Sequence, residues 1–303
     1  MLPIYVLDPN WANNNMPDAW PFFKFMRPFT RGDTRTIATV KNMSGLKLNS
    51  GNLQFDIFGA HNEKVVFFCH SLGANRNLWD RQTEHLSREF KVIRIDLRGH
   101  GQSDLFETPY SIKILALDVI ALLDHLNVEK CTFIGLSLGS MIGLWLGIYR
   151  PERLTRMILA GASAKVVNKN PFYRRIAIIR QNGLSSIFGE LNERWYHSDF
   201  TSRRPEIVKS IQAMLLRTSV EGYIAAMIAV RDFDVSAQLA KVSTPTLLIT
   251  GLEDKATPIS EAQLIAKKTK ATRLKSIKSA SHLAIVEKPA VFDQALYSFV
   301  MEQ

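Results

Sequence analysis

The sequence predicts an α/β fold, with a mostly parallel eight-stranded sheet, helices on both faces and a helical lid. Three observations support this prediction. Short, continuously apolar segments recur along the chain, as expected of strands that are covered on both faces. Helical patterns lie between them, and such an alternation is typical of a parallel sheet. Across residues 164–242 the pattern is helical throughout, which predicts an insertion between two strands.

The first predicted strands form a hairpin, with segments 46–50 and 53–59 on either side of a turn at Gly51-Asn52. The clearest helix covers 111–127, where apolar residues fall at helical spacing behind Ser111 as N-cap. A final helix is predicted over 289–301. The other predicted strands are 64–70, 91–97, 131–136, 156–161, 246–251 and 272–277.

These elements divide the chain into an N-terminal extension at 1–45, an α/β core at 46–163 and 243–303, and a lid at 164–242. The extension is rich in proline and aromatic residues, which argues against a free disordered tail. We expect it to pack on the core, on a partner or on a membrane surface, and the sequence leaves these alternatives open.

The charge and the cysteine content limit the classes of protein to which this chain can belong. A net charge of +10 suggests binding to nucleic acid or to a membrane surface. However, no run of five like charges occurs, so no nucleic-acid partner is predicted. Two cysteines and the absence of an export signal favour a reducing compartment, here the cytoplasm. The uncharged segment 131–149 has the length of a membrane span, yet its glycines and serines favour a buried strand, a turn and a buried helix, so no transmembrane segment is expected.

The strongest motif is the G-x-S-x-G pentapeptide at 135–139, directly between an apolar strand and a glycine-rich helix. In this context Ser137 is predicted to be a nucleophile on a strained turn, where flanking glycines avoid clashes between strand and helix. The backbone N–H of Leu138, at the helix N-terminus, would stabilise an oxyanion. The alternative is glycine-mediated helix packing around an incidental serine.

A serine nucleophile requires a base and an orienting acid, which in this motif follow the serine in the order acid, then histidine. His282 lies in a loop before the last helix and is the predicted base, whereas His197 lies inside the lid. Asp254 follows the strand 246–251 and is the predicted acid, with Glu253 as its rival. The backbone N–H of Leu72, after the strand 64–70, is assigned as the second oxyanion donor.

Other chemistries lack their motifs. The chain has no zinc-type Cys/His spacing, no phosphate-binding P-loop and no dinucleotide fingerprint, so no metal and no cofactor are predicted.

Further motifs extend over the chain at 46–303. One set comprises D-x-R-G-x-G-x-S at 96–103, the G-x-S-x-G pentapeptide at 135–139, Gly-Leu-Glu-Asp at 251–254 with Thr257-Pro258, and Ser281-His282. A second set comprises Ser-Leu-Gly at 71–73 with Trp79, Arg-Trp-Tyr at 194–196 with Phe200, and T-x-x-E-G-Y at 218–223.

On the first set the chain resembles the α/β-hydrolase superfamily, and on the second it resembles the 3-oxoadipate enol-lactonase group within it. Two positions depart from this likeness: Ser140 stands where a second glycine is common, and His70 where asparagine is frequent, so the lactone itself does not follow.

The resemblance implies a hydrolase that cleaves an ester or lactone bond of a small molecule through an acyl-enzyme. Acyl transfer to another acceptor, C–C bond hydrolysis and ligand binding without catalysis remain alternatives, because they need the same residues or the same fold.

The predicted lid indicates the polarity and the charge of the substrate. Trp195 would supply part of an apolar pocket wall, or else hold lid helices together. Residues 165–241 carry 12 basic and 7 acidic residues, a net charge of +5. An inward arginine would pair with a substrate carboxylate, as an oxo-acid lactone requires, whereas outward arginines would only solvate the lid.

Overall fold

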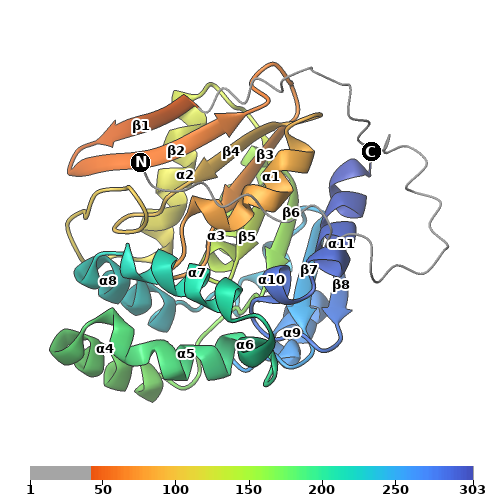
Figure 1. Ribbon diagram of the computed structural model, residues 1–303. Helices are drawn as coiled ribbons and strands as arrows, with labels where there is room; N and C mark the ends of the chain where they lie inside the picture. Colours follow the sequence, from red (N-terminus) through yellow and green to blue (C-terminus); the bar gives the residue numbers. More distant parts are fainter. Residues whose placement is uncertain (1–41, 303) are drawn as a thin grey trace, which may run out of the picture. The chain divides into compact units, whose positions relative to one another are not determined.

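The computed structural model describes residues 42–302, in which one mixed sheet carries helices on both faces (Figure 1). The strand order is β1-β2-β4-β3-β5-β6-β7-β8. Strand β2 runs antiparallel to both its neighbours, β1 and β4, and every other neighbouring pair is parallel. This confirms the predicted mostly parallel, eight-stranded sheet. The strands are β1 Asn42–Leu48, β2 Gly51–Phe58, β3 Val65–Cys69, β4 Lys91–Ile95, β5 Cys131–Leu136, β6 Leu154–Ala160, β7 Thr246–Gly251 and β8 Thr272–Ile277.

The two faces of the sheet bury alternate residues of the same strands. Phe67 and Phe133 pack on one face against α2, α3 and α9. Val66 and Ile134 pack on the other face against α1, α10 and α11. Because both faces are covered, β5 and β7 are buried along their whole length. The helices are α1 Asp80–Leu86, α2 Ile112–His125, α3 Leu138–Tyr149, α9 Ile259–Lys268, α10 Ala284–Glu287 and α11 Pro289–Met301.

The hairpin differs from its prediction. Leu48 pairs with Gly51, so the turn is Asn49-Ser50 rather than Gly51-Asn52, and β1 begins at Asn42. A contact from outside the hairpin is made beside this turn: Asp104 Oδ2 accepts from the backbone N–H and the side-chain amide of Asn52, both at 2.9 Å. The predicted extension at 1–45 lies almost entirely outside the described residues.

Local capping and burial follow the sequence pattern in the central layers. The Ser111 side chain accepts from the N–H of Ile114 and begins α2, as predicted. The uncharged segment 131–149 forms the buried strand β5 and the buried helix α3. Within residues 42–302 no single helix is long and apolar enough to cross a membrane. Two helices bent by 98° relative to each other, α7 (Pro205–Leu216) and α8 (Val220–Arg231), together reach that length and composition.

The segment between β6 and β7 is helical, as predicted, and has an apolar core of its own. Ile176, Leu191, Leu215 and Tyr223 form part of this core, against which Leu72 from the loop after β3 also packs. Figure 1 shows these green and teal helices gathered at one end of the sheet. They are α4 Asn170–Asn182, α5 Phe188–Trp195, α6 Phe200–Arg203, α7 Pro205–Leu216 and α8 Val220–Arg231.

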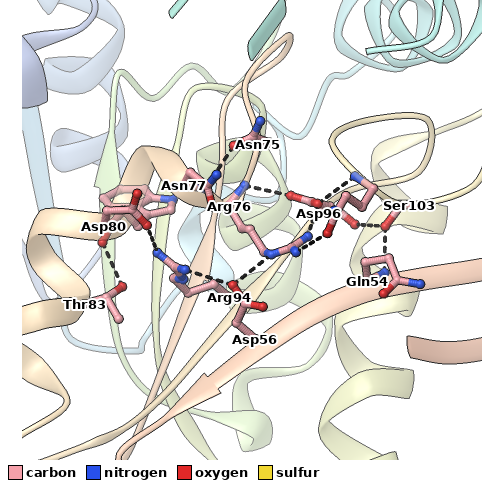
Figure 2. A network of polar contacts seen from close by, with 12 residues as sticks. Gln54, Asp56, Asn75, Arg76, Asn77, Asp80, Thr83, Arg94, Asp96 and Ser103 are labelled. Carbon is pink, nitrogen blue, oxygen red and sulfur yellow. Dashed lines mark hydrogen bonds and ion pairs between the residues drawn. The ribbon is translucent and has the colours of Figure 1, made fainter. Parts of the chain in front are cut away.

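A buried charge network joins β2, β4 and the segment after β3 (Figure 2). Asp56 Oδ2 accepts from Arg76 Nε and from Arg94 Nη2, both at 2.9 Å, and all three side chains are almost fully buried. Arg76 also pairs with Asp96. Asp96 therefore binds Arg76 rather than Arg98, whose guanidinium pairs with Asp118 of α2 at 2.5 Å. Within the 96–103 motif, Asp96 Oδ2 also accepts from the backbone N–H of Gln102 at 2.9 Å, so local and non-local contacts both hold this carboxylate.

We predict that Asp56→Ala lowers the free energy of unfolding by about 3–5 kcal/mol, because it leaves two buried guanidinium groups without their shared carboxylate. Asp80→Ala is the matched control. Asp80 also pairs with Arg94, but its side chain is 67% exposed, so the loss should stay below about 1 kcal/mol. Urea unfolding measures both values, and equal losses would contradict the prediction.

Candidate active site

Ser137 lies in the sharp connection between β5 and α3, and its φ of 55° is left-handed, a strained conformation for a serine. The flanking glycines permit this turn. A Cβ on Gly135 would lie 2.3 Å from the carbonyl oxygen of Gly139, and a Cβ on Gly139 would lie 2.3 Å from that of Cys69. Ser137 is also partly exposed between buried neighbours, so its hydroxyl remains accessible.

His282 and Asp254 form a buried hydrogen-bonded pair. His282 Nδ1 lies 2.8 Å from Asp254 Oδ2, and the two side chains are 3% and 0% exposed. Gly251 allows their loops to meet, because a Cβ there would lie 2.2 Å from the carbonyl oxygen of Ser281. The pair is held on two adjacent loops at the carboxyl end of the sheet.

Further hydrogen bonds keep the Asp254 carboxylate ionised. Oδ1 accepts from the N–H groups of Ala256 and Thr257, both at 2.8 Å, and Oδ2 accepts from the Thr257 hydroxyl at 2.7 Å. Burial alone would raise the pKa of Asp254, but the charge of His282 and these hydrogen bonds outweigh it and hold the pKa below its usual value. Sequence reasoning gave Thr257 no role, although a threonine three residues after an aspartate is a common local hydrogen-bonding pattern.

One backbone segment separates Ser137 from His282. The N–H of Ser137 donates to the carbonyl of Ala160 at 2.8 Å, and a Cβ on the next residue, Gly161, would lie 2.9 Å from Cε1 of His282. Within the described residues the Ser137 hydroxyl makes no hydrogen bond. The structure therefore joins His282 to Asp254 by a hydrogen bond and places Ser137 nearby, without a hydrogen bond from its hydroxyl. Catalytic hydrogen bonds are often long or poorly aligned before substrate binds.

The two predicted oxyanion donors lie on adjoining segments. Leu138 is the first residue of α3, where backbone N–H groups have no partner within the helix. Leu72 follows β3, and the close contact of Gly139 with Cys69 holds that strand end against α3. Within residues 42–302 the Leu72 N–H donates no backbone hydrogen bond.

His70 anchors this loop as a neutral ring. Its Nε2 accepts from the N–H of Leu97 at 2.9 Å, so Nδ1 carries the proton and donates to the carbonyl of Ser71 at 2.8 Å. Burial lowers the pKa of His70 to about 4, and burial together with the nearby His70 lowers the pKa of His100 to about 3. His70 therefore has a structural role in this loop.

We predict that acidification weakens the fold through these two histidines. Between about pH 4 and 6.5 the unfolded chain binds their protons and the folded chain does not, so each lowers the unfolding free energy by up to about 1.4 kcal/mol per pH unit. Urea unfolding at pH 7, 6 and 5 measures the slope. His70→Gln should make the slope shallower and the exposed His125→Gln should not, and equal slopes in all three proteins would refute this assignment.

The two rival residues pair with each other. His197 Nε2 lies 2.9 Å from Glu253 Oε2, and His197 Nδ1 lies 2.6 Å from Asp199. His197 and Glu253 therefore form a separate, partly exposed contact beside the His282–Asp254 pair. The structure gives neither rival a place next to Ser137.

The end of α5 is fastened to the loop that carries His282. The carbonyl of Trp195 accepts from the N–H of Leu283 at 3.0 Å. The Glu287 carboxylate accepts from the N–H groups of His197 and Ser281, both at 2.6 Å, a bridge that the sequence did not suggest. The half-buried Trp195 ring packs against two apolar clusters, one of the sheet and one of the helical segment, so it does hold elements together.

Known proteins of one family are similar to this chain. The chain matches the family model described as the alpha/beta hydrolase fold over residues 64–289. It is 35% identical to 3-oxoadipate enol-lactonase 2 of Acinetobacter baylyi, over 80% of this chain and 91% of that protein.

Two crystal structures are similar to this chain, each at a TM-score of 0.82. One is a hydrolase from Pseudomonas aeruginosa, 35% identical, and the match covers 86% of this chain and 99% of that chain. The other is the enol-lactonase from Burkholderia xenovorans, 28% identical, and the match covers 86% of this chain and 100% of that chain. With the family model covering most of the chain and this fold in common, the chain belongs to the α/β-hydrolase family of enzymes.

Proposed function

We propose that the protein is a serine hydrolase that cleaves an ester or lactone bond of a small molecule through an acyl-enzyme at Ser137. The observation that carries this proposal is the buried hydrogen bond between His282 and Asp254, at 2.8 Å, beside a serine in a left-handed elbow. The names of the enol-lactonases to which the chain is similar support the bond class.

In the proposed reaction, Ser137 Oγ attacks the substrate carbonyl while Nε2 of His282 takes its proton. The Leu72 and Leu138 N–H groups donate to the resulting oxyanion. As the carbonyl re-forms, the bond to the leaving oxygen breaks and His282 gives that oxygen the proton. Water then attacks the acyl-enzyme by the same route and releases the acid and the free serine. Asp254 accepts from Nδ1–H and stabilises the imidazolium in both halves.

The helical segment would serve as the lid of this site. The proposed division is an extension at 1–45, a core at 46–163 and 243–303, and a lid at 164–242 that excludes water from Ser137. The half-buried Trp195, at the end of α5, is proposed as part of the pocket wall as well as a packing residue.

A fluorophosphonate probe tests the proposal, because it labels only an activated serine. We expect one label on the native protein, on the peptide that contains Ser137, and none on denatured protein. Native protein that stays unlabelled would favour a ligand-binding role on the same fold.

A further inference from the structure

The proposed base, His282, lies in the loop between β8 and α10, residues 278–283, here called the His282 loop. Hydrogen bonds hold the backbone on both sides of this histidine. Directly before it, the N–H of Ser281 donates to Glu287 Oε2 at 2.6 Å. Directly after it, the N–H of Leu283 donates to the carbonyl of Trp195 at 3.0 Å. These two bonds therefore determine where the His282 ring can lie.

The Glu287 carboxylate connects the His282 loop to the helical segment. Its second oxygen, Oε1, accepts from the N–H of His197 at 2.6 Å, two residues after Trp195. Both oxygens accept from backbone N–H groups, which suits the ionised carboxylate, since it has acceptor sites only. Hydrogen bonds to an ionised acceptor are roughly twice as strong as those between neutral groups. Glu287 thus joins the loop to residues 195–197 with a side chain, at a point where the Leu283 bond joins them with backbone alone.

The His282 loop needs such support, because its own backbone is strained. Ser279 has a left-handed φ of 52°, which is uncommon for a residue other than glycine. The loop is also pressed against the end of β7, since a Cβ on Gly251 would lie 2.3 Å from the carbonyl oxygen of Ala280. A strained backbone persists only where the surrounding structure holds it. Loss of one support would therefore let the loop relax.

The surroundings of the His282 ring leave little room for such a shift. On one side its Nδ1 lies 2.8 Å from Asp254 Oδ2. On another side its Cε1 lies 2.9 Å from the position that a Cβ on Gly161 would take. A displacement of about 1 Å in a catalytic group can cost about 100-fold in rate. A small movement of the loop would thus impair the transfer of a proton from Ser137 while leaving the fold intact.

We propose that Glu287 is a positioning residue, which holds the His282 loop against residues 195–197 and so sets the geometry between His282 and Ser137. This inference rests on the proposed serine hydrolase function. It adds a residue that touches neither the substrate nor the reacting atoms. It also couples the helical segment to the base, because a shift of residues 195–197 would move His282 with them.

The test measures kcat and KM for 4-nitrophenyl hexanoate in two variants of Glu287. Glu287→Gln keeps one acceptor oxygen and should lower kcat about 10-fold, whereas Glu287→Ala loses both and should lower it about 100-fold. KM should stay within about twofold of the wild-type value, because the bonds that are lost act on the transition state for proton transfer and not on substrate binding.

Glu261→Gln is the matched control. Glu261 is half-buried, like Glu287, and its carboxylate also joins two segments, since its Oε2 accepts from the Ser163 hydroxyl at 3.1 Å. That bond connects α9 to the segment after β6 rather than to the His282 loop. The control should therefore keep the wild-type kcat.

A proton NMR signal separates positioning from a purely structural role. The proton on Nδ1 of His282 lies in a buried hydrogen bond to Asp254, so its resonance should be far downfield in the wild type and in Glu261→Gln. In Glu287→Ala this resonance should shift or broaden, because the ring is no longer held in one position. Urea unfolding measures the stability of each variant. A purely structural role would lower that stability and leave the resonance and kcat unchanged.

The outcomes separate this inference from the proposed function. If folded Glu287→Ala keeps the wild-type kcat, or if Glu261→Gln loses as much, the positioning role is refuted and the hydrolase function stands. If the wild type neither cleaves the ester nor is labelled at Ser137 by the fluorophosphonate, the proposed function itself fails. If the wild type is labelled but does not cleave this ester, the rate of labelling replaces kcat in every comparison.

Should neither Glu287 variant fold, Ser281→Ala decides alone. Its hydroxyl donates to the carbonyl of Arg194 at 3.3 Å, so it fastens the His282 loop to the same end of α5. Ser281→Ala should lower kcat severalfold at an unchanged KM, and a wild-type kcat would refute the inference.

Discussion

Ser137→Ala is expected to lower kcat for ester hydrolysis by about 10⁵- to 10⁶-fold, because nothing else in the site can form the acyl-enzyme. The change removes one oxygen from a partly exposed side chain that makes no hydrogen bond with another described residue, so folding should be unaffected. Steady-state hydrolysis of 4-nitrophenyl hexanoate measures the activity, and urea unfolding checks the fold.

The residual rate of hydrolysis by Ser137→Ala reports on the other groups of the proposed site. Donors at Leu72 and Leu138 and the bound geometry would remain in the variant, so hydrolysis should still exceed that in water alone. Activity within tenfold of the wild type would show that Ser137 is not the nucleophile. In that event a water activated directly by His282 would be the better mechanism.

Asp254→Asn should cost about 10⁴-fold in kcat, because an amide cannot hold His282 with its proton on Nδ1 and its Nε2 free to accept from serine. The hydrogen bonds from Ala256 and Thr257 to Oδ1 can persist with the amide oxygen, so the loop should keep its conformation. Hydrolysis of the hexanoate ester at neutral pH, where the low pKa of Asp254 keeps the wild type ionised, measures the loss.

Glu253→Gln is the matched control for this prediction. It neutralises the adjacent carboxylate, which lies on the same loop but pairs with His197 at 2.9 Å. The control should retain activity within severalfold of the wild type. A loss in Glu253→Gln as large as that in Asp254→Asn would mean that the acid was assigned to the wrong residue.

Much of this protein was predictable because its determinants are local in the chain. The continuous burial of β5 and β7 follows from runs of mainly apolar side chains in the sequence. Similarly, the turn at Ser137 needs Gly135 and Gly139 on either side, since a Cβ on either glycine would lie 2.3 Å from a backbone carbonyl oxygen. Spacing of this kind can be recognised without knowing the rest of the fold.

The pairing of side chains from distant segments was decided only by tertiary structure. Sequence order left Asp254 and Glu253 as rivals, and the fold separated them by joining one to His282 and the other to His197. Likewise Asp104, 52 residues away in the chain, accepts a hydrogen bond from Asn52 next to the hairpin turn, a contact that only the fold creates.

The helical segment between β6 and β7 shows the same division between local and non-local determinants. Composition indicates a basic helical segment, but whether an arginine faces the site depends on how α4, α5 and α8 pack around Tyr223. Adjacent Arg174 and Arg175 illustrate the point, because one side chain is 67% exposed and the other 5%. A helix places neighbouring residues about 100° apart, and only its contact with other elements decides which of them is buried.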